Sequence, residues 1–124
     1  MTLGRAGRWA AVVIYAGFIF GLSAQQNLAV PLPTLISDKV YHATEYAGFA
    51  GVIAFALRAG GSQFVLSRAL LLATLYGLSD EYHQQFVPGR TSDLADVAAD
   101  VTGAGLACLV LYLSRWRRGR SSTE

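Results

Sequence analysis

Seven of the chain's eight acidic residues and both of its histidines occur in three short clusters. Carboxylates and imidazoles bind divalent metal ions and transfer protons, so these clusters are the first candidates for chemistry. The clusters are Asp38/His42/Glu45, Asp80/Glu81/His83 and Asp93/Asp96/Asp100. The spacing i, i+4, i+7 in the first cluster and i, i+3, i+7 in the third predicts that each occupies one face of a helix.

Three kinds of chemistry fit these clusters. One is a divalent metal ion held by Asp96 and Asp100 together with Glu45 or His42. Another is acid–base chemistry, in which neighbouring carboxylates and a histidine move protons. The third is recognition of a polar or zwitterionic group at a membrane surface.

Lys39 and Arg90 are the obvious cationic partners near these clusters, and Pro88-Gly89 predicts a tight turn that projects the Arg90 side chain. A planar guanidinium there could pair with Asp93 or Asp96, or hold a phosphate or carboxylate ligand. An internal salt-bridge network that pins the helix ends is the competing interpretation. Seven carboxylates against two cations and two histidines exceed what such packing requires.

The rest of the chain is apolar enough to predict a membrane protein. Its 124 residues are 53% hydrophobic and only 15% charged, with a mean hydropathy of +0.39, and they suggest one domain, residues 1–124. A spanning helix needs about 20 mostly apolar residues. We therefore predict an all-α, polytopic membrane protein with a four-helix transmembrane bundle. The predicted spans are residues 9–24, 40–57, 64–83 and 94–113.

Arginine placement predicts the orientation of this bundle. The N-terminus, the 58–68 segment and the 115–120 segment are basic, which indicates that all three face the cytoplasm. Both termini would then be cytoplasmic, and all three acidic clusters would meet at the extracytoplasmic face. An alternative is that the first segment is a cleaved signal peptide ending near Ser23-Ala24, which would leave three spans and the same acidic face.

Small residues four apart predict where helices approach closely in lipid. They occur at Gly17/Gly21, Ala47/Gly51 and Gly103/Ala107. The single Cys108 excludes an internal disulfide and a multi-cysteine metal site, and we expect it to be a packing residue. Scattered arginines without interleaved aromatics argue against a nucleic-acid partner.

Three segments together resemble the VanZ-like family over roughly residues 35–113. They are Asp38-Lys-Val-Tyr-His42-Ala-Thr-Glu45-Tyr46, Tyr76-Gly-Leu-Ser-Asp-Glu81-Tyr-His-Gln-Gln85-Phe-Val-Pro88-Gly89-Arg90 and Ser92-Asp93-Leu-Ala-Asp96-Val-Ala-Ala-Asp100-Val-Thr-Gly103. Asp100 departs from the pattern, because the resemblance leads us to expect asparagine there in many relatives. The resemblance implies a small integral protein of the bacterial cytoplasmic membrane, in a family whose namesake is associated with resistance to teicoplanin. It supplies a context, the cell envelope and its lipid-linked wall precursors, but no reaction.

These observations yield one set of candidate site residues. The candidate catalytic residues are His42, Glu45, Glu81, Arg90 and Asp96. The candidate ligand-binding residues are Asp38, Tyr46, Gln85, Arg90 and Asp93. The candidate ligands of a divalent metal ion are Asp96, Asp100 and Glu45.

Three functions are consistent with this set. The first is a membrane enzyme or lipid-headgroup-binding protein that acts outside the cytoplasm on a phosphorylated or glycosylated lipid, or on a peptide attached to one, such as a lipid-linked cell-wall precursor. The second is a proton- or ion-coupled carrier or flippase, against which the acids occur at one end only and no inverted repeat is visible. The third is a non-catalytic accessory module that the polar cluster holds together.

Overall fold

The computed structural model describes residues 3–25, 35–58 and 64–121, the side chains of 35–37 and 116–121 excepted. Four helices occupy nearly all of these residues: α1 (Arg5–Ser23), α2 (Leu35–Arg58), α3 (Val65–Gln84) and α4 (Leu94–Ser121). The all-α prediction is confirmed. The sequence also predicts an extended linker around Pro31 and Pro33 and a tight turn at Gly60-Gly61, but both lie outside the described residues. The turn at Pro88-Gly89 is present, and Gly89 supplies its positive φ of 80°.

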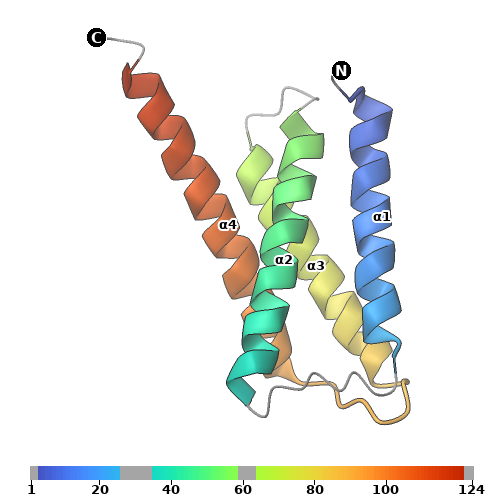
Figure 1. Cartoon of the computed structure of the whole chain (residues 1–124). Coiled ribbons are helices and arrows are strands. Elements are labelled where there is room, and N and C mark those ends of the chain that lie inside the picture. The colour runs from blue at the N-terminus through green and yellow to red at the C-terminus, as the bar shows by residue number, and fades with distance from the viewer. Residues whose placement is uncertain (1–2, 26–34, 59–63, 122–124) are drawn as a thin grey trace.

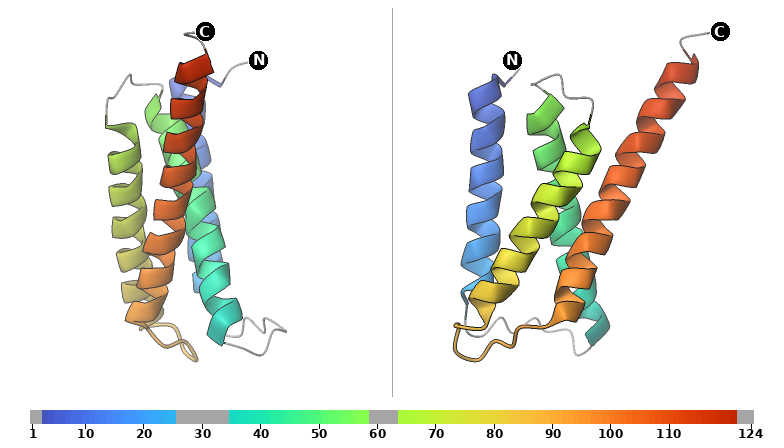
Figure 2. Two further views of the ribbon diagram at one scale, coloured as in Figure 1. Left: turned by 90° about the vertical axis from the view of Figure 1, so that its left-hand side faces the viewer. Right: turned by 180° about the vertical axis from the view of Figure 1, so that it is seen from behind.

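The helices run alternately up and down, so that α1 begins and α4 ends at the same end of the bundle (Figure 1). α2 is the central element and packs against each of the other three helices, whereas α1 does not contact α4. α4 packs closely on α2 at its N-terminal end and leans away from the bundle toward its C-terminus (Figure 2).

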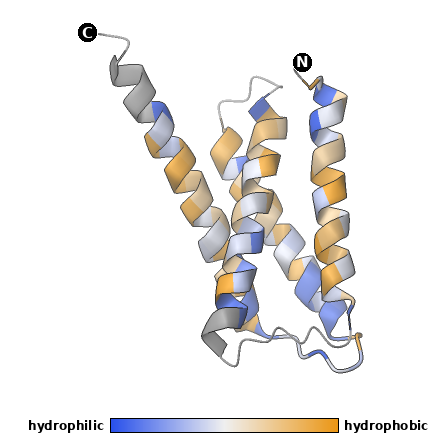
Figure 3. Cartoon of the chain, in the orientation of Figure 1, coloured by the Kyte–Doolittle hydropathy of each residue, from blue (hydrophilic) through white to orange (hydrophobic). Residues whose placement is uncertain are grey.

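Two of the four helices are long and apolar enough to cross a membrane, namely α1 and residues 94–115 of α4. Their apolar side chains mostly face outward: Ile14 is 72% exposed and Val110 is 62% exposed. The core helix of a soluble domain would bury such residues. Figure 3 shows apolar residues along the middle of both helices and hydrophilic residues toward the ends. The four-span topology and the cytoplasmic location of both termini stay predictions.

Small side chains let α2 and α4 approach most closely. A Cβ at Gly103 would overlap the backbone of Ala43, so only glycine fits at this crossing. Gly17, Gly21 and Gly51 have open space around the position of a Cβ, so these three glycines of the predicted small-residue steps mark no close contact. Cys108 is a buried, free packing residue, as predicted.

Candidate functional site

All three acidic clusters lie at one end of the bundle, where α1 and α3 end and α2 and α4 begin (Figure 1). Contacts between helices establish this convergence. His42 on α2 contacts Asp100 on α4, Ser23 on α1 contacts Asp80 on α3, and the backbone N–H of Asp93 contacts Glu81 on α3. The three acidic clusters therefore meet at one end of the bundle, whereas the extracytoplasmic location of that end stays a prediction.

His42 and Asp100 form the most buried polar pair of the site. His42 Nδ1 lies 2.9 Å from Asp100 Oδ1, and the residues are 6% and 1% exposed. A carboxylate can only accept, so Nδ1 carries the proton of this bond. Nε2 then lies 3.9 Å from Asp96 Oδ2 and makes no hydrogen bond within the described residues. Gly77 makes room for this pair, because a Cβ there would lie 3.1 Å from Asp100 Oδ2.

Lys39 connects three of the carboxylates at the rim of the site. Its ammonium donates to Asp96 and lies 3.4 Å from Asp93 and 3.6 Å from Asp38. The hydrogen bond to Asp96 raises the pKa of Lys39 above its usual value. Asp93 also starts α4, because its Oδ1 accepts a hydrogen bond from the backbone N–H of Ala95. That bond, assisted by the charge of Lys39, holds the pKa of Asp93 below its usual range.

A second polar group joins α1 to α3. Ser23 Oγ donates to Asp80 Oδ1 at 2.6 Å, and Gln84 Nε2 lies 3.4 Å from Asp80 Oδ2. All three residues are buried. Asp80 belongs to the second acidic cluster, but neither Asp80 nor Gln84 was among the predicted site residues. Their i, i+4 spacing was the available signal, because it places both on the same helical face.

Arg90 lines a polar cavity of about 180 Å³ at this end. The cavity is also lined by Asp38, His42, Gln84, Gly89, Thr91 and Asp96. The Nε atom of Arg90 is buried, and its guanidinium forms no ion pair with any carboxylate of the described residues. The predicted pairing of Arg90 with Asp93 or Asp96 is thus absent from the described part of the chain, and the cation lines the cavity without an ion-pair partner among those residues.

The residues that could hold a metal ion differ from the predicted set. Asp38, His42 and Asp96 each offer one ligand atom within 4.8 Å of the others. Asp100 instead contacts His42 Nδ1, so it would orient the imidazole rather than bind the metal ion itself. Glu45, the remaining predicted ligand, does not belong to this group within the described residues. The ammonium of Lys39 already neutralises part of the negative charge of Asp38 and Asp96, because it bonds to Asp96 and lies near Asp38.

The remaining predicted residues lie in different surroundings. Glu45 and Glu81 each have one buried carboxylate oxygen without a hydrogen-bond partner among the described residues. Tyr46 is completely buried in the core, with its ring edge-on to Phe49. Gln85 is exposed and donates to the backbone oxygen of Tyr82, so the structure does not bring it into the site. Its neighbour Gln84 lines the cavity instead.

These features describe a small helical membrane protein with a polar cavity at one end of its bundle. The VanZ/LLP1 family matches residues 8–115, and the chain belongs to that family. It is also similar to the uncharacterized protein C11E3.10 of the fission yeast Schizosaccharomyces pombe. The two are 31% identical over 97 residues, which make up 78% of this chain and 60% of the yeast protein. The chain therefore spans less than two thirds of that relative's length. No solved structure matches the chain significantly.

Proposed function

We propose that this protein binds the phosphate-bearing headgroup of a membrane lipid in the Arg90 cavity and acts on that headgroup there. The carrying observation is Arg90, a half-buried guanidinium that faces an acid-lined cavity and pairs with none of the described carboxylates. A cation buried for packing alone would be expected to pair with a neighbouring acid. A planar guanidinium left unpaired is suited to hold a phosphate through two parallel hydrogen bonds.

An apolar groove beside the cavity supports a lipid rather than a soluble ligand. It lies between α2 and α4, has a volume of about 540 Å³, and is lined by Lys39, Val40, Ala43, Ala95, Ala98, Ala99 and Thr102. Lys39 lines this groove and also bonds to Asp96 of the cavity. A headgroup in the cavity and an acyl chain in the groove could therefore belong to one molecule.

The His42–Asp100 pair supports chemistry as well as binding. Asp100 fixes the imidazole and leaves Nε2 toward Asp96 and the cavity, which His42 lines. A histidine oriented by a carboxylate in this way can accept a proton from an attacking group and return it to a leaving group. Asp38, His42 and Asp96 could alternatively hold a divalent metal ion that polarises the phosphate, with Lys39 displaced from Asp96.

The family context supports a ligand of the cell envelope, such as a lipid-linked wall precursor, reached from the extracytoplasmic side of a bacterial cytoplasmic membrane. The basic residues at the opposite end support that orientation. A similar protein also occurs in a fission yeast, an organism outside the bacteria. The proposal therefore names a chemistry, a phosphate-bearing lipid headgroup, rather than one wall precursor.

Lipid binding by the purified full-length protein tests the proposal. Native mass spectrometry would compare the wild type, Arg90→Gln and Arg68→Gln with phospholipids of equal chain length and different headgroups. Arg68 is exposed at the start of α3, far from the cavity, so the second variant removes the same charge elsewhere. We expect Arg90→Gln to weaken binding about tenfold or more, because hydrogen bonds to charged groups contribute about 1.5–3 kcal/mol. Equal binding by all three proteins would refute the proposal.

A second measurement distinguishes an enzyme from a lipid carrier and from a protein with a purely structural role. Phosphorus NMR of lipid incubated with wild type and His42→Gln would reveal a new phosphorus species only if the headgroup is altered. Transbilayer movement without a new species would favour a carrier or flippase. Binding with neither result would leave a receptor or accessory role.

A further inference from the structure

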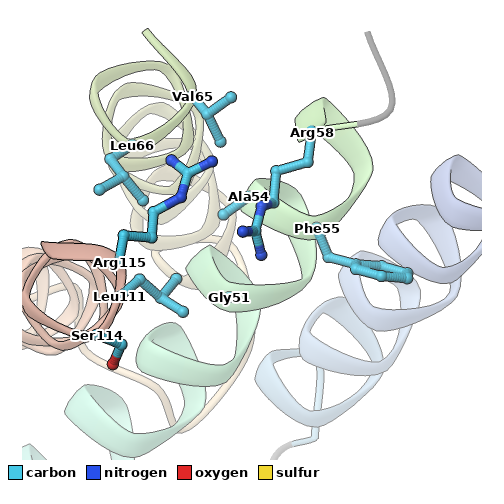
Figure 4. A pocket seen from close by; sticks show the side chains of 9 residues that line it. All are labelled: Gly51, Ala54, Phe55, Arg58, Val65, Leu66, Leu111, Ser114 and Arg115. Atoms are coloured by element: carbon cyan, nitrogen blue, oxygen red, sulfur yellow. The ribbon is translucent and has the colours of Figure 1, made fainter. Parts of the chain in front are cut away.

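A second cavity lies at the opposite end of the bundle, between α2, α3 and α4 (Figure 4). It has a volume of about 200 Å³, several times the roughly 30 Å³ share of one liquid water molecule. Its wall is mainly apolar and includes Gly51, Ala54, Val65, Leu66 and Leu111. Arg58 from α2 and Arg115 from α4 extend toward one another across it (Figure 4).

The described charged side chains at this end of the bundle are all of one sign. Among the residues whose side chains the structure describes, the acids all lie at the other end, and five arginines lie at this one. The five are Arg5, Arg8, Arg58, Arg68 and Arg115. Arg8 already makes a cation–π contact, because its guanidinium lies 4.4 Å from the ring centroid of Phe55. Arg58 and Arg115 form no ion pair with any described residue.

We infer that this cavity binds an anionic glycerophospholipid, with the phosphate between Arg58 and Arg115 and the start of an acyl chain in the apolar space. Basic pockets between membrane helices recognise anionic headgroups through charge. A soluble anion would leave the apolar wall unfilled, and a zwitterionic lipid would lack the net negative charge that these two arginines, which have no ion pair among the described residues, favour. The inference is independent of the proposed function, because none of these residues belongs to the Arg90 cavity.

Competition between two lipids tests the inference. The full-length protein is placed in nanodiscs with equal amounts of phosphatidylglycerol and phosphatidylcholine of the same chain length, and retained lipid is measured by native mass spectrometry. The wild type should retain the anionic lipid preferentially. Arg58→Gln and Arg115→Gln should each reduce that retention about fivefold, since one arginine near an anionic surface contributes about 1 kcal/mol. The matched control Arg68→Gln should change it little.

A fourth variant tests the apolar half of the site without changing a charge. Gly51 lines the cavity with open space where a Cβ would be, so Gly51→Leu should fill the cavity and leave the helix intact. We expect reduced retention of the anionic lipid, with unchanged helix content by circular dichroism. Equal retention of both lipids by the wild type, an equal loss in Arg68→Gln, or no effect of Gly51→Leu would overturn the inference. Repeating the series with Arg90→Gln excludes lipid bound at the other end.

Discussion

His42 on α2 and Asp100 on α4 are joined by a 2.9 Å contact between Nδ1 and Oδ1, and both side chains are buried. This contact connects the two helices that pack most extensively in the bundle. It also determines which imidazole nitrogen remains for a ligand. The same pair therefore contributes to the stability of the bundle and to the geometry of the candidate site.

Two substitutions of Asp100 should distinguish what its hydrogen bond contributes to stability from what its charge contributes. Asp100→Ala leaves a buried imidazole N–H without its acceptor and should lower the free energy of unfolding by about 1–3 kcal/mol. Asp100→Asn keeps an acceptor oxygen and should be the milder change. Chemical unfolding in detergent would measure both. The control Asp93→Asn, at a more exposed acid that starts the same helix, should change stability by less than about 0.5 kcal/mol. Unaltered stability of Asp100→Ala would contradict the structural role of the pair.

Gly77 should tolerate no side chain, because it lies against this pair. A Cβ there would lie 3.1 Å from Asp100 Oδ2 and 3.3 Å from Tyr46 Cε1. We expect Gly77→Ala to destabilise the protein by about 1–3 kcal/mol through overpacking. Gly105→Ala is the matched control, because open space surrounds that position, and alanine should stabilise α4 there by about 0.5–1 kcal/mol. Equal effects of the two substitutions, measured by thermal unfolding, would show that Gly77 is not under this constraint.

Ser23 should be required for docking of α1 onto α3. Its hydroxyl is the closest partner of the buried Asp80 carboxylate, so Ser23→Ala should cost about 1–3 kcal/mol in unfolding free energy. Ser79→Ala removes an exposed hydroxyl that bonds only within its own helix, and it should be nearly neutral. The same unfolding experiment compares the two variants. Similar losses for both would argue against a specific α1–α3 contact.

Periodicity predicted the helices and the shared acidic end because both depend on local spacing. The i, i+3, i+7 positions of α4 predict that Asp96 and Asp100 face the bundle, and both are buried there. Composition and hydropathy likewise predicted a membrane protein, and α1 and α4 carry the exposed apolar side chains expected of one.

Individual partners could not be predicted, because they depend on the rotation and tilt of each helix. Gln84 and Gln85 differ by one position, about 100° around a helix, and only Gln84 faces the cavity. The candidate metal ligands in the structure differ from the predicted ones for the same reason. Asp38 lies near His42 and Asp96, whereas Asp100 bonds to the other imidazole nitrogen.

The predicted topology places the two ends of the bundle on opposite sides of a membrane. In a Cys108→Ala background, Thr91→Cys and Leu3→Cys introduce exposed thiols at opposite ends of the bundle. An impermeant maleimide added to intact cells should label position 91 and should label position 3 only after the membrane is opened. Labelling of both positions in intact cells would contradict the four-span topology.

The central claim is that Arg90 holds the phosphate of a lipid headgroup, and a structure determined in a lipid bilayer tests it most directly. The account predicts density for a phosphate-bearing headgroup within hydrogen-bond distance of the Arg90 guanidinium, beside His42 and Asp96. An ion pair between Arg90 and Asp38 or Asp96, with lipid present and no density in the cavity, would contradict it.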